Sequence, residues 1–216
     1  MILAERLTFQ IYNHQKGVTS VDIQNEVVAS GSLDNKAQAW NMTSGKKLIE
    51  VAHENDVFCI KLVHERLLSC GDKTVRVWSL QDGSELHKFQ HSSWCNNFDL
   101  NFDETLLAVA HSGGLTIWDF SNRIKLQEIE INDVYDVRFN ESGMKLVFGL
   151  HDGTVFYTEV KNYNNSLKFA EVLKMSHNIW ALPRETFCWL NETKAIVVST
   201  NNAMTEGNCS ILDTVS

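Results

Sequence analysis

Apolar and polar residues alternate along most of the chain in short runs. The segments 36–39 and 74–77, for example, place apolar side chains at every second position and polar ones between them. This period of two predicts β-strands with one buried face rather than helices. Turn-forming residues, such as those at 31–35 and 82–83, separate the runs. The pattern therefore predicts an all-β chain made of short strands.

The strands fall into a unit that recurs along the chain. Each complete copy starts with a His, continues through an apolar strand and a segment of small residues, and ends with a turn Asp and a Trp. The closing tryptophans Trp40, Trp78 and Trp118 are 38 and 40 residues apart. A repeat of about 40 residues that holds four short strands is the signature of a β-propeller blade.

The repeats predict a single propeller domain over residues 1–216. They lie at about 14–51, 53–90, 91–131, 132–172 and 177–216, and residues 7–12 form a fourth strand that is able to close the last blade. About five blades are therefore visible. Two interpretations remain open: a closed five-bladed ring, and part of a larger ring.

Two copies carry a full set of polar residues at matching positions. The set is His14, Ser30, Asp34 and Trp40 in the first copy, and His53, Ser69, Asp72 and Trp78 in the second. In this arrangement the chain resembles the WD40-repeat family over nearly its whole length. The resemblance implies a hydrogen-bonded network within each blade, in which the buried Trp N–H finds an acceptor and a carboxylate holds the His in one tautomer. Members of that family favour about seven blades, so we favour the interpretation of a partial ring.

The polar set becomes incomplete in later copies. The third copy keeps His91 and Trp118, but Ala110 stands at the strand Ser position and Ser112 at the Asp position. The predicted structural network therefore consists of His14, Ser30, Asp34, Trp40, His53, Ser69, Asp72, Trp78, His91 and Trp118.

Charge and cysteine content narrow the choice of partners and compartment. A net charge of −8 disfavours nucleic acid and anionic membranes, because both attract positive surfaces. The five cysteines are scattered, without a C-x-x-C pair, and are expected to be reduced thiols. The N-terminus lacks the apolar core of a secretory signal, so we expect a cytoplasmic or nuclear protein.

Catalytic and metal-binding interpretations are weak. Ser, His and Asp recur in consecutive repeats, which a single active site has no reason to do. His87 and His91 straddle a connection between blades, and His111 and His151 are isolated loop residues, so we predict no metal site. We predict no enzymatic activity, no cofactor and no small-molecule substrate, with a hydrolase as a remote alternative.

A recognition surface remains as the functional candidate. Phe58 and Tyr135 lie near the starts of first strands, Trp94 immediately precedes one, and His151 lies beside a turn between second and third strands. These four residues form the predicted protein-binding rim, with aromatic side chains as anchors. We predict a scaffold that binds other proteins, and a resemblance to F-box/WD proteins implies substrate recruitment to a cullin-type ubiquitin ligase, with any F-box outside this chain. The alternative is a general assembly scaffold unrelated to ubiquitin.

Overall fold

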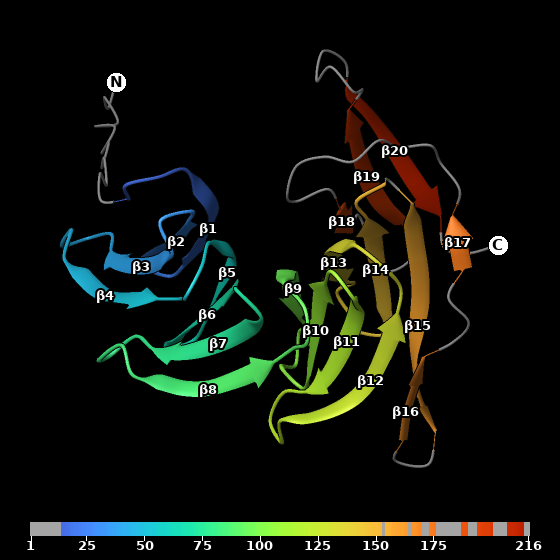
Figure 1. Cartoon of the computed structure of the whole chain (residues 1–216), viewed down its shortest axis with the longest axis horizontal. Coiled ribbons are helices and arrows are strands. Elements are labelled where there is room, and N and C mark those ends of the chain that lie inside the picture. Colours follow the sequence, from blue (N-terminus) through green and yellow to red (C-terminus); the bar gives the residue numbers. More distant parts are fainter. Residues whose placement is uncertain are drawn as a thin grey trace, which may run out of the picture. The chain divides into compact units, whose positions relative to one another are not determined.

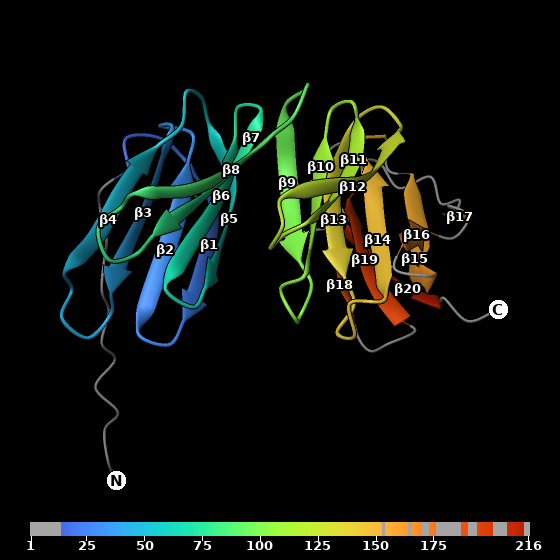
Figure 2. The same ribbon diagram turned by 90° about the horizontal axis from the view of Figure 1, so that it is seen from below.

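The computed structural model describes residues 14–152, 154–163, 166–169, 173–175, 187–189, 194–200 and 207–213. These residues form antiparallel β-sheets (Figures 1 and 2), which confirms the predicted all-β class. They include no helix long and apolar enough to cross a membrane. The chain divides into two compact units. Unit 1 is Met1–Asp72 with Arg76–Lys88, and unit 2 is Lys73–Val75 with Phe89–Ser216.

Unit 1 is built on two four-stranded sheets, each with the up-and-down order of a propeller blade. The first sheet is β1 (Val18–Gln24), β2 (Val27–Ser32), β3 (Lys36–Asn41) and β4 (Lys47–Ala52). The second is β5 (Val57–Val63), β6 (Arg66–Gly71), β7 (Thr74–Ser79) and β8 (Glu85–Gln90). Strand β1 lies beside β5 (Figure 1), so that the first strands of the two blades are neighbours.

Unit 2 repeats this construction. Its first blade is β9 (Cys95–Leu100), β10 (Leu106–His111), β11 (Gly114–Asp119) and β12 (Ile124–Glu130). Its second is β13 (Val134–Phe139), β14 (Lys145–Leu150) and β15 (Val155–Tyr163) with β16 (Ser166–Phe169) and β17 (Leu173–Met175). A further sheet consists of β18 (Phe187–Trp189), β19 (Lys194–Thr200) and β20 (Gly207–Asp213).

The fourth strand of the second blade in unit 2 differs from expectation. Alternation predicts one strand at 167–172, whereas β16 and β17 both pair with β15, at different parts of its length. Strand β15 is nine residues long, and this length leaves room for two short partners. The predicted closing strand at 7–12 lies outside the described residues, and the choice between a closed and a partial ring stays a prediction.

Small and branched apolar residues fill the space between neighbouring blades. In unit 1, Ala29, Ala37 and Ala39 of the first blade pack with Val57 and Ile60 of the second. In unit 2, the corresponding core combines β10 and β11 with β13 and β14. Alanines on the facing surface let two twisted sheets approach closely at the level of their inner strands.

The outward face of β1 is also apolar. Val18, Val21 and Ile23 are each more than half exposed, whereas the equivalent residues of β5 are buried against the first blade: Val57, Ile60 and Leu62. The face therefore has the composition of a blade-to-blade contact.

Polar side chains on the first strand of one blade bond to the backbone of the next. In unit 1, Thr19 donates to the carbonyl of Val57 at 2.6 Å, and Asp22 accepts the N–H of Leu62 at 2.7 Å. The donor and acceptor of these bonds are 38 and 40 residues apart. We call such a pair of bonds an inter-blade clasp.

Unit 2 contains the same clasp. Asn96 donates to the carbonyl of Val134 at 2.8 Å, and Asp99 accepts the N–H of Phe139 at 2.9 Å. The sequence separations are again 38 and 40 residues. Because Asp99 is buried and also accepts the N–H of Leu100, its carboxylate satisfies two backbone donors that water cannot reach.

Loss of the clasp should destabilise the protein. We expect Asp99→Ala to lower the free energy of unfolding by about 1–3 kcal/mol, because the N–H of Phe139 is left buried without its acceptor. Urea unfolding followed by tryptophan fluorescence measures the change, with the exposed Glu130→Ala as the matched control. Equal midpoints for the two variants would show that the clasp carries no stability.

Candidate protein-binding rim and the networks beneath it

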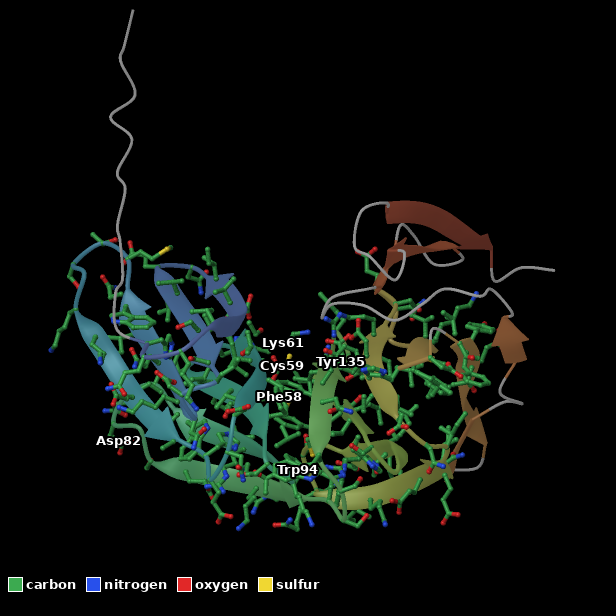
Figure 3. The ribbon with its side chains drawn as sticks, turned by 45° about the horizontal axis from the view of Figure 1, so that its top comes forward. Phe58, Cys59, Lys61, Asp82, Trp94 and Tyr135 are labelled. Carbon is green, nitrogen blue, oxygen red and sulfur yellow. The ribbon has the colours of Figure 1, made fainter. Side chains whose placement is uncertain are left out.

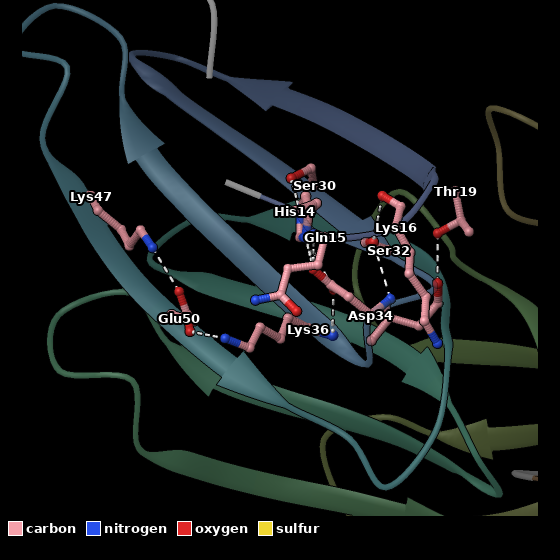
Figure 4. A network of polar contacts seen from close by, with 11 residues as sticks. His14, Gln15, Lys16, Thr19, Ser30, Ser32, Asp34, Lys36, Lys47 and Glu50 are labelled. Atoms are coloured by element: carbon pink, nitrogen blue, oxygen red, sulfur yellow. Dashed lines mark hydrogen bonds and ion pairs between the residues drawn. The ribbon is translucent and has the colours of Figure 1, made fainter. Parts of the chain in front are cut away.

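A polar network anchors the turn between β2 and β3 in the first blade (Figure 4). His14 Nδ1 donates to Asp34 at 3.0 Å, and His14 Nε2 accepts the Ser30 hydroxyl at 2.7 Å. Asp34 also accepts the N–H groups of Gln15 and Lys36, and the His14 ring meets the buried Trp40 edge to face. Burial alone would raise the pKa of Asp34, but the bonds from Gln15 and His14 lower it below the ordinary value. Asp34 is thus held as a carboxylate, which keeps the proton of His14 on Nδ1.

The second blade shows the network in its complete form. Trp78 Nε1 donates to the Ser69 hydroxyl oxygen at 2.8 Å, and that hydroxyl lies 2.7 Å from His53 Nε2. His53 Nδ1 lies 3.2 Å from the carboxylate of Asp72, which Arg76 approaches at 3.4 Å. A single serine hydroxyl therefore satisfies two buried rings, as acceptor for one and donor for the other.

The third blade lacks this hydroxyl. Ser69 pairs with Ile60 in the second blade, and Val109 pairs with Phe98 at the matching position of the third blade. Val109 is therefore equivalent to the serine, and the prediction that put Ala110 at this position was one residue off. The turn between the first and second strands is longer in this blade, so the spacing from the His does not locate the serine position. Among the described residues, His91 Nε2 and Trp118 Nε1 are buried without a hydrogen-bond partner. Burial lowers the pKa of His91 to about 3, so its imidazole is neutral.

His111 forms a different network in this blade. The sequence suggested an isolated loop residue, but His111 is the last residue of β10 and is almost fully buried. Its Nδ1 accepts the Ser93 hydroxyl at 2.8 Å and the N–H of Gly113 at 3.2 Å, so Nε2 carries the proton and bonds to Thr116 at 2.8 Å. Burial lowers the pKa of His111 as well. The ring ties the connection before β9 to the turn after β10.

Two of the predicted rim residues of unit 2, Trp94 and Tyr135, are labelled in Figure 3: Trp94 immediately precedes β9, and Tyr135 is the second residue of β13. His151 follows the end of β14 that pairs with the start of β13. Trp94 is 43% exposed, and its carbonyl accepts the N–H of Ser112 at 2.9 Å. Tyr135 and His151 meet edge to face with ring centroids 5.6 Å apart. The structure therefore brings Tyr135 and His151 into contact, and Trp94 precedes the neighbouring inner strand.

Irregularities in strand pairing determine the direction in which Phe58 and Tyr135 project from their strands. The pairing of the first strand shifts between Val57 and Cys59, and again between Val134 and Asp136, which leaves Phe58 and Tyr135 outside the ladder. A bulge of this kind re-aims a side chain. The equivalent positions in the other two blades hold Thr19 and Asn96, which form the clasps. Phe58 is partly buried on β5 of unit 1.

The rim shows no preformed metal centre. The described residues contain no group of three or more His, Cys, Asp or Glu side chains arranged to hold an ion. Cys59, Cys70 and Cys95 are present as thiols in the structure. The predicted lack of cofactor and metal stays a prediction.

A hydroxyl at position 109 should repair the third network. Val109→Thr exchanges a methyl group for a hydroxyl of nearly the same size at the position equivalent to Ser69. We expect this hydroxyl to bond to His91 Nε2 and Trp118 Nε1 and the free energy of unfolding to rise by about 1 kcal/mol. The matched control is Val137→Thr, which puts a hydroxyl into an apolar core and should destabilise. Both changes are measured by urea unfolding. A loss of stability in both variants alike would mean that the two ring nitrogens do not reach position 109.

Neutral His91 should also make folding stability depend on pH. Its pKa falls from 6.5 to about 3 on folding, so unfolding in acid takes up a proton. The free energy of unfolding should therefore decrease as the pH drops from 6.5 towards 3, and should be insensitive to this group above 6.5. His91→Phe should make the decrease shallower in a series of urea titrations. Equal slopes for the two proteins would show that His91 takes up no proton on unfolding.

Comparison with known proteins supports the repeat assignment. The WD domain, G-beta repeat family matches residues 5–41 and 45–79. The chain is 24% identical over 166 residues to the WD repeat-containing protein 55 homolog of Dictyostelium discoideum, an alignment that covers 73% of this chain and 40% of that protein. It is 21% identical over 149 residues to the small ribosomal subunit protein RACK1y of Oryza sativa subsp. japonica, covering 63% and 44%. The chain spans less than half the length of these two curated relatives.

The fold has a counterpart among solved structures. The crystal structure of the computationally designed Ika8 protein matches with a TM-score of 0.72 and 19% identity, covering 94% of this chain and 60% of that one. WD-repeat proteins serve as interaction scaffolds, and their propeller fold is generally non-enzymatic. Residues 5–41 and 45–79 thus match two repeats of the WD40 family, and the four-stranded blades and the His–Ser–Trp network of the second blade agree with that match.

Proposed function

We propose that this chain is a non-enzymatic scaffold that binds a protein partner at the rim formed by Trp94, Tyr135 and His151. The observation that carries the proposal is the exposure of Trp94. Trp40 and Trp78 are buried in their networks, whereas Trp94 is 43% exposed at the entrance to β9 and lies outside the networks that the described residues form. A large aromatic ring left in contact with water at a rigid position is a typical anchor for a partner.

The residues around Trp94 hold its backbone in a fixed position before any partner binds. Its backbone is fixed to the turn after β10 through Ser112, and the same turn is held by His111 and Ser93. On the next blade, the contact of Tyr135 with His151 limits the freedom of a second aromatic ring. A partner would therefore lose little conformational entropy in ordering this surface.

The wider role that we propose is assembly of a multi-protein complex. The sequence left two scaffold roles open, ubiquitin-ligase recruitment and general assembly. The rice relative is named a small ribosomal subunit protein, which supports assembly, and neither relative's name refers to ubiquitin. We therefore favour a general assembly scaffold over a ligase subunit.

We further propose that the protein works in the cytoplasm or nucleus. The thiols of Cys59, Cys70 and Cys95 support a reducing compartment. The net charge of −8 supports protein rather than nucleic acid or anionic membrane as the partner.

Substitutions at the rim should remove the partner without unfolding the protein. We expect Trp94→Ala to weaken binding by about 2 kcal/mol, roughly thirtyfold in Kd, and Tyr135→Ala to weaken it less. Quantitative affinity purification with the whole chain as bait identifies the partners, and titration of a recovered partner gives the affinities. Phe58→Ala tests whether the residue predicted in unit 1 takes part in binding.

The matched control is Leu86→Ala, since Leu86 is 42% exposed on β8 and belongs to no proposed surface. Partners recovered by the wild-type chain and by Leu86→Ala, but not by Trp94→Ala, support the rim. An unchanged set of partners for a folded Trp94→Ala, Tyr135→Ala double variant would place the binding surface elsewhere.

A further inference from the structure

We propose that unit 2 carries a second docking surface, at the opposite ends of β9 and β13, for a basic peptide segment with an apolar side chain. The surface is formed by the turn β9–β10 and the turn β13–β14, and we call it the turn patch: Phe102, Asp103, Glu141 and Met144. It is separate from the rim of Trp94 and Tyr135, because those residues lie at the starts of the same two strands and the patch follows their ends.

Two large apolar side chains face water on these turns. Phe102 is 85% exposed and Met144 is 49% exposed. The corresponding turns of unit 1 are shorter and polar, with Asn25-Glu26 after β1 and His64-Glu65 after β5. A propeller turn therefore has no structural need for an exposed Phe or Met, and the two residues stand out as candidates for binding.

Both turns are rigid and built alike. Asn101 begins the first, and its side-chain oxygen accepts the N–H of Leu106 at 2.8 Å. Asn140 begins the second, and its side-chain oxygen accepts the N–H of Lys145 at 2.9 Å. Both asparagines are buried. The backbone that carries Phe102 and Met144 is thus held by hydrogen bonds, so the exposed side chains sit on a preorganised support.

The two turns abut each other. Gly143 lies against Asn101 so closely that a Cβ at position 143 would be 3.0 Å from the Cβ of Asn101. Gly143 also has φ of +71°, a conformation that L-residues with side chains rarely adopt. The glycine therefore permits the close approach that places the turns of Phe102 and Met144 side by side.

The charged residues around the turn patch determine which sign of charge a partner should carry. Asp103, Glu104 and Glu141 lie on the two turns. Asp119 ends β11 next to the adjoining β11–β12 turn, which holds a cation, Arg123. A bond from the N–H of Asn122 lowers the pKa of Asp119, so this group is ionised. The cation at the end of the second turn, Lys145, lies over the ring of Tyr157 at 5.8 Å. The surface is therefore negative around its apolar side chains.

Exposed apolar side chains within a negative surface favour a basic peptide over a second copy of the chain, nucleic acid or an anionic membrane. Two copies of the chain that paired through the same patch would bring like charges together, which disfavours a symmetric dimer. Nucleic acid and anionic lipid would be repelled for the same reason. A segment with Lys or Arg beside a Leu, Met or aromatic residue matches both the acids and the apolar pair.

An array of immobilised peptides, in which net charge and apolar content vary independently, tests this surface on the whole chain. We expect enrichment of peptides that combine basic and apolar residues, and weaker binding at high salt. For the best peptide, Phe102→Ala should raise Kd at least roughly tenfold, and Glu141→Lys should raise it as well. Trp94→Ala should leave this Kd unchanged, so failure of the rim and failure of the turn patch are distinguishable.

The controls address stability and non-specific attraction. Because Phe102 is exposed, Phe102→Ala should melt at the wild-type temperature, and Leu86→Ala should bind the peptide like the wild type. Equal affinity for a peptide of the same charge with Ser in place of its apolar residue would reduce the contact to bulk electrostatics and overturn the proposal. So would unchanged binding by Phe102→Ala, or a dimer in sedimentation velocity that this substitution abolishes.

Discussion

The need to satisfy buried polar groups is the constraint on which this structure depends. A blade packed between neighbours buries the edges of its inner strand, and every N–H and C=O there must find a partner within the protein. Side chains that can provide such partners therefore recur at fixed positions. Asp22 and Asp99 accept backbone donors of the following blade, while Ser69 connects the indole of Trp78 to the ring of His53. The packing of apolar residues between blades is possible because these bonds satisfy the polar groups that the packing buries.

The same constraint explains where the repeats diverge. Without a hydroxyl at position 109, the third blade leaves one nitrogen of His91 and one of Trp118 without a partner among the described residues. His91 responds by remaining neutral, since a charged imidazole in that environment would cost far more than an unpaired nitrogen. His111 meanwhile ties together its own connections through Ser93 and Thr116. The blade thus keeps the apolar contacts of the network and forms its polar contacts around His111 instead.

Much of the fold could be predicted from the sequence because its signals are local. Alternation at 36–39 and the spacing of the closing tryptophans identify four-stranded blades without any knowledge of long-range contacts. The inter-blade clasp could not be predicted in this way, since Asp22 and Leu62 are 40 residues apart and Asp22 alone has the pattern of a solvent-facing strand residue. A signal did exist: polar residues at Thr19 and Asp22 recur at Asn96 and Asp99 with the same internal spacing.

Turn length was the other obstacle to prediction. The longer turn between β9 and β10 changes the spacing between His91 and the residue equivalent to the serine. Spacing from the His therefore led to Ala110 in place of Val109. Spacing from the closing Trp is the better guide, because that stretch has the same length in both blades: Ser69 precedes Trp78 by nine residues, as Val109 precedes Trp118. A shift of one residue matters in a strand, since it moves a side chain to the opposite face of the sheet.

The rim residues could be predicted from the sequence, whereas the turn patch could not. Tyr135 and Phe58 could be selected because their positions in the repeat are known, and the bulge supplies the physical cause of their presentation. The turn patch escaped sequence analysis because Phe102 and Met144 lie in turns, where apolar residues carry no periodic signal. Their exposure becomes meaningful only once the buried asparagines are seen to hold the turns through side-chain bonds. In a repeat protein, structural duties are assigned to fixed positions, so a residue that departs from the repeat on a rigid support is free to serve binding. At both ends of β9 and β13, the residues at repeat positions build the blade, and those that depart from the repeat are available to a partner.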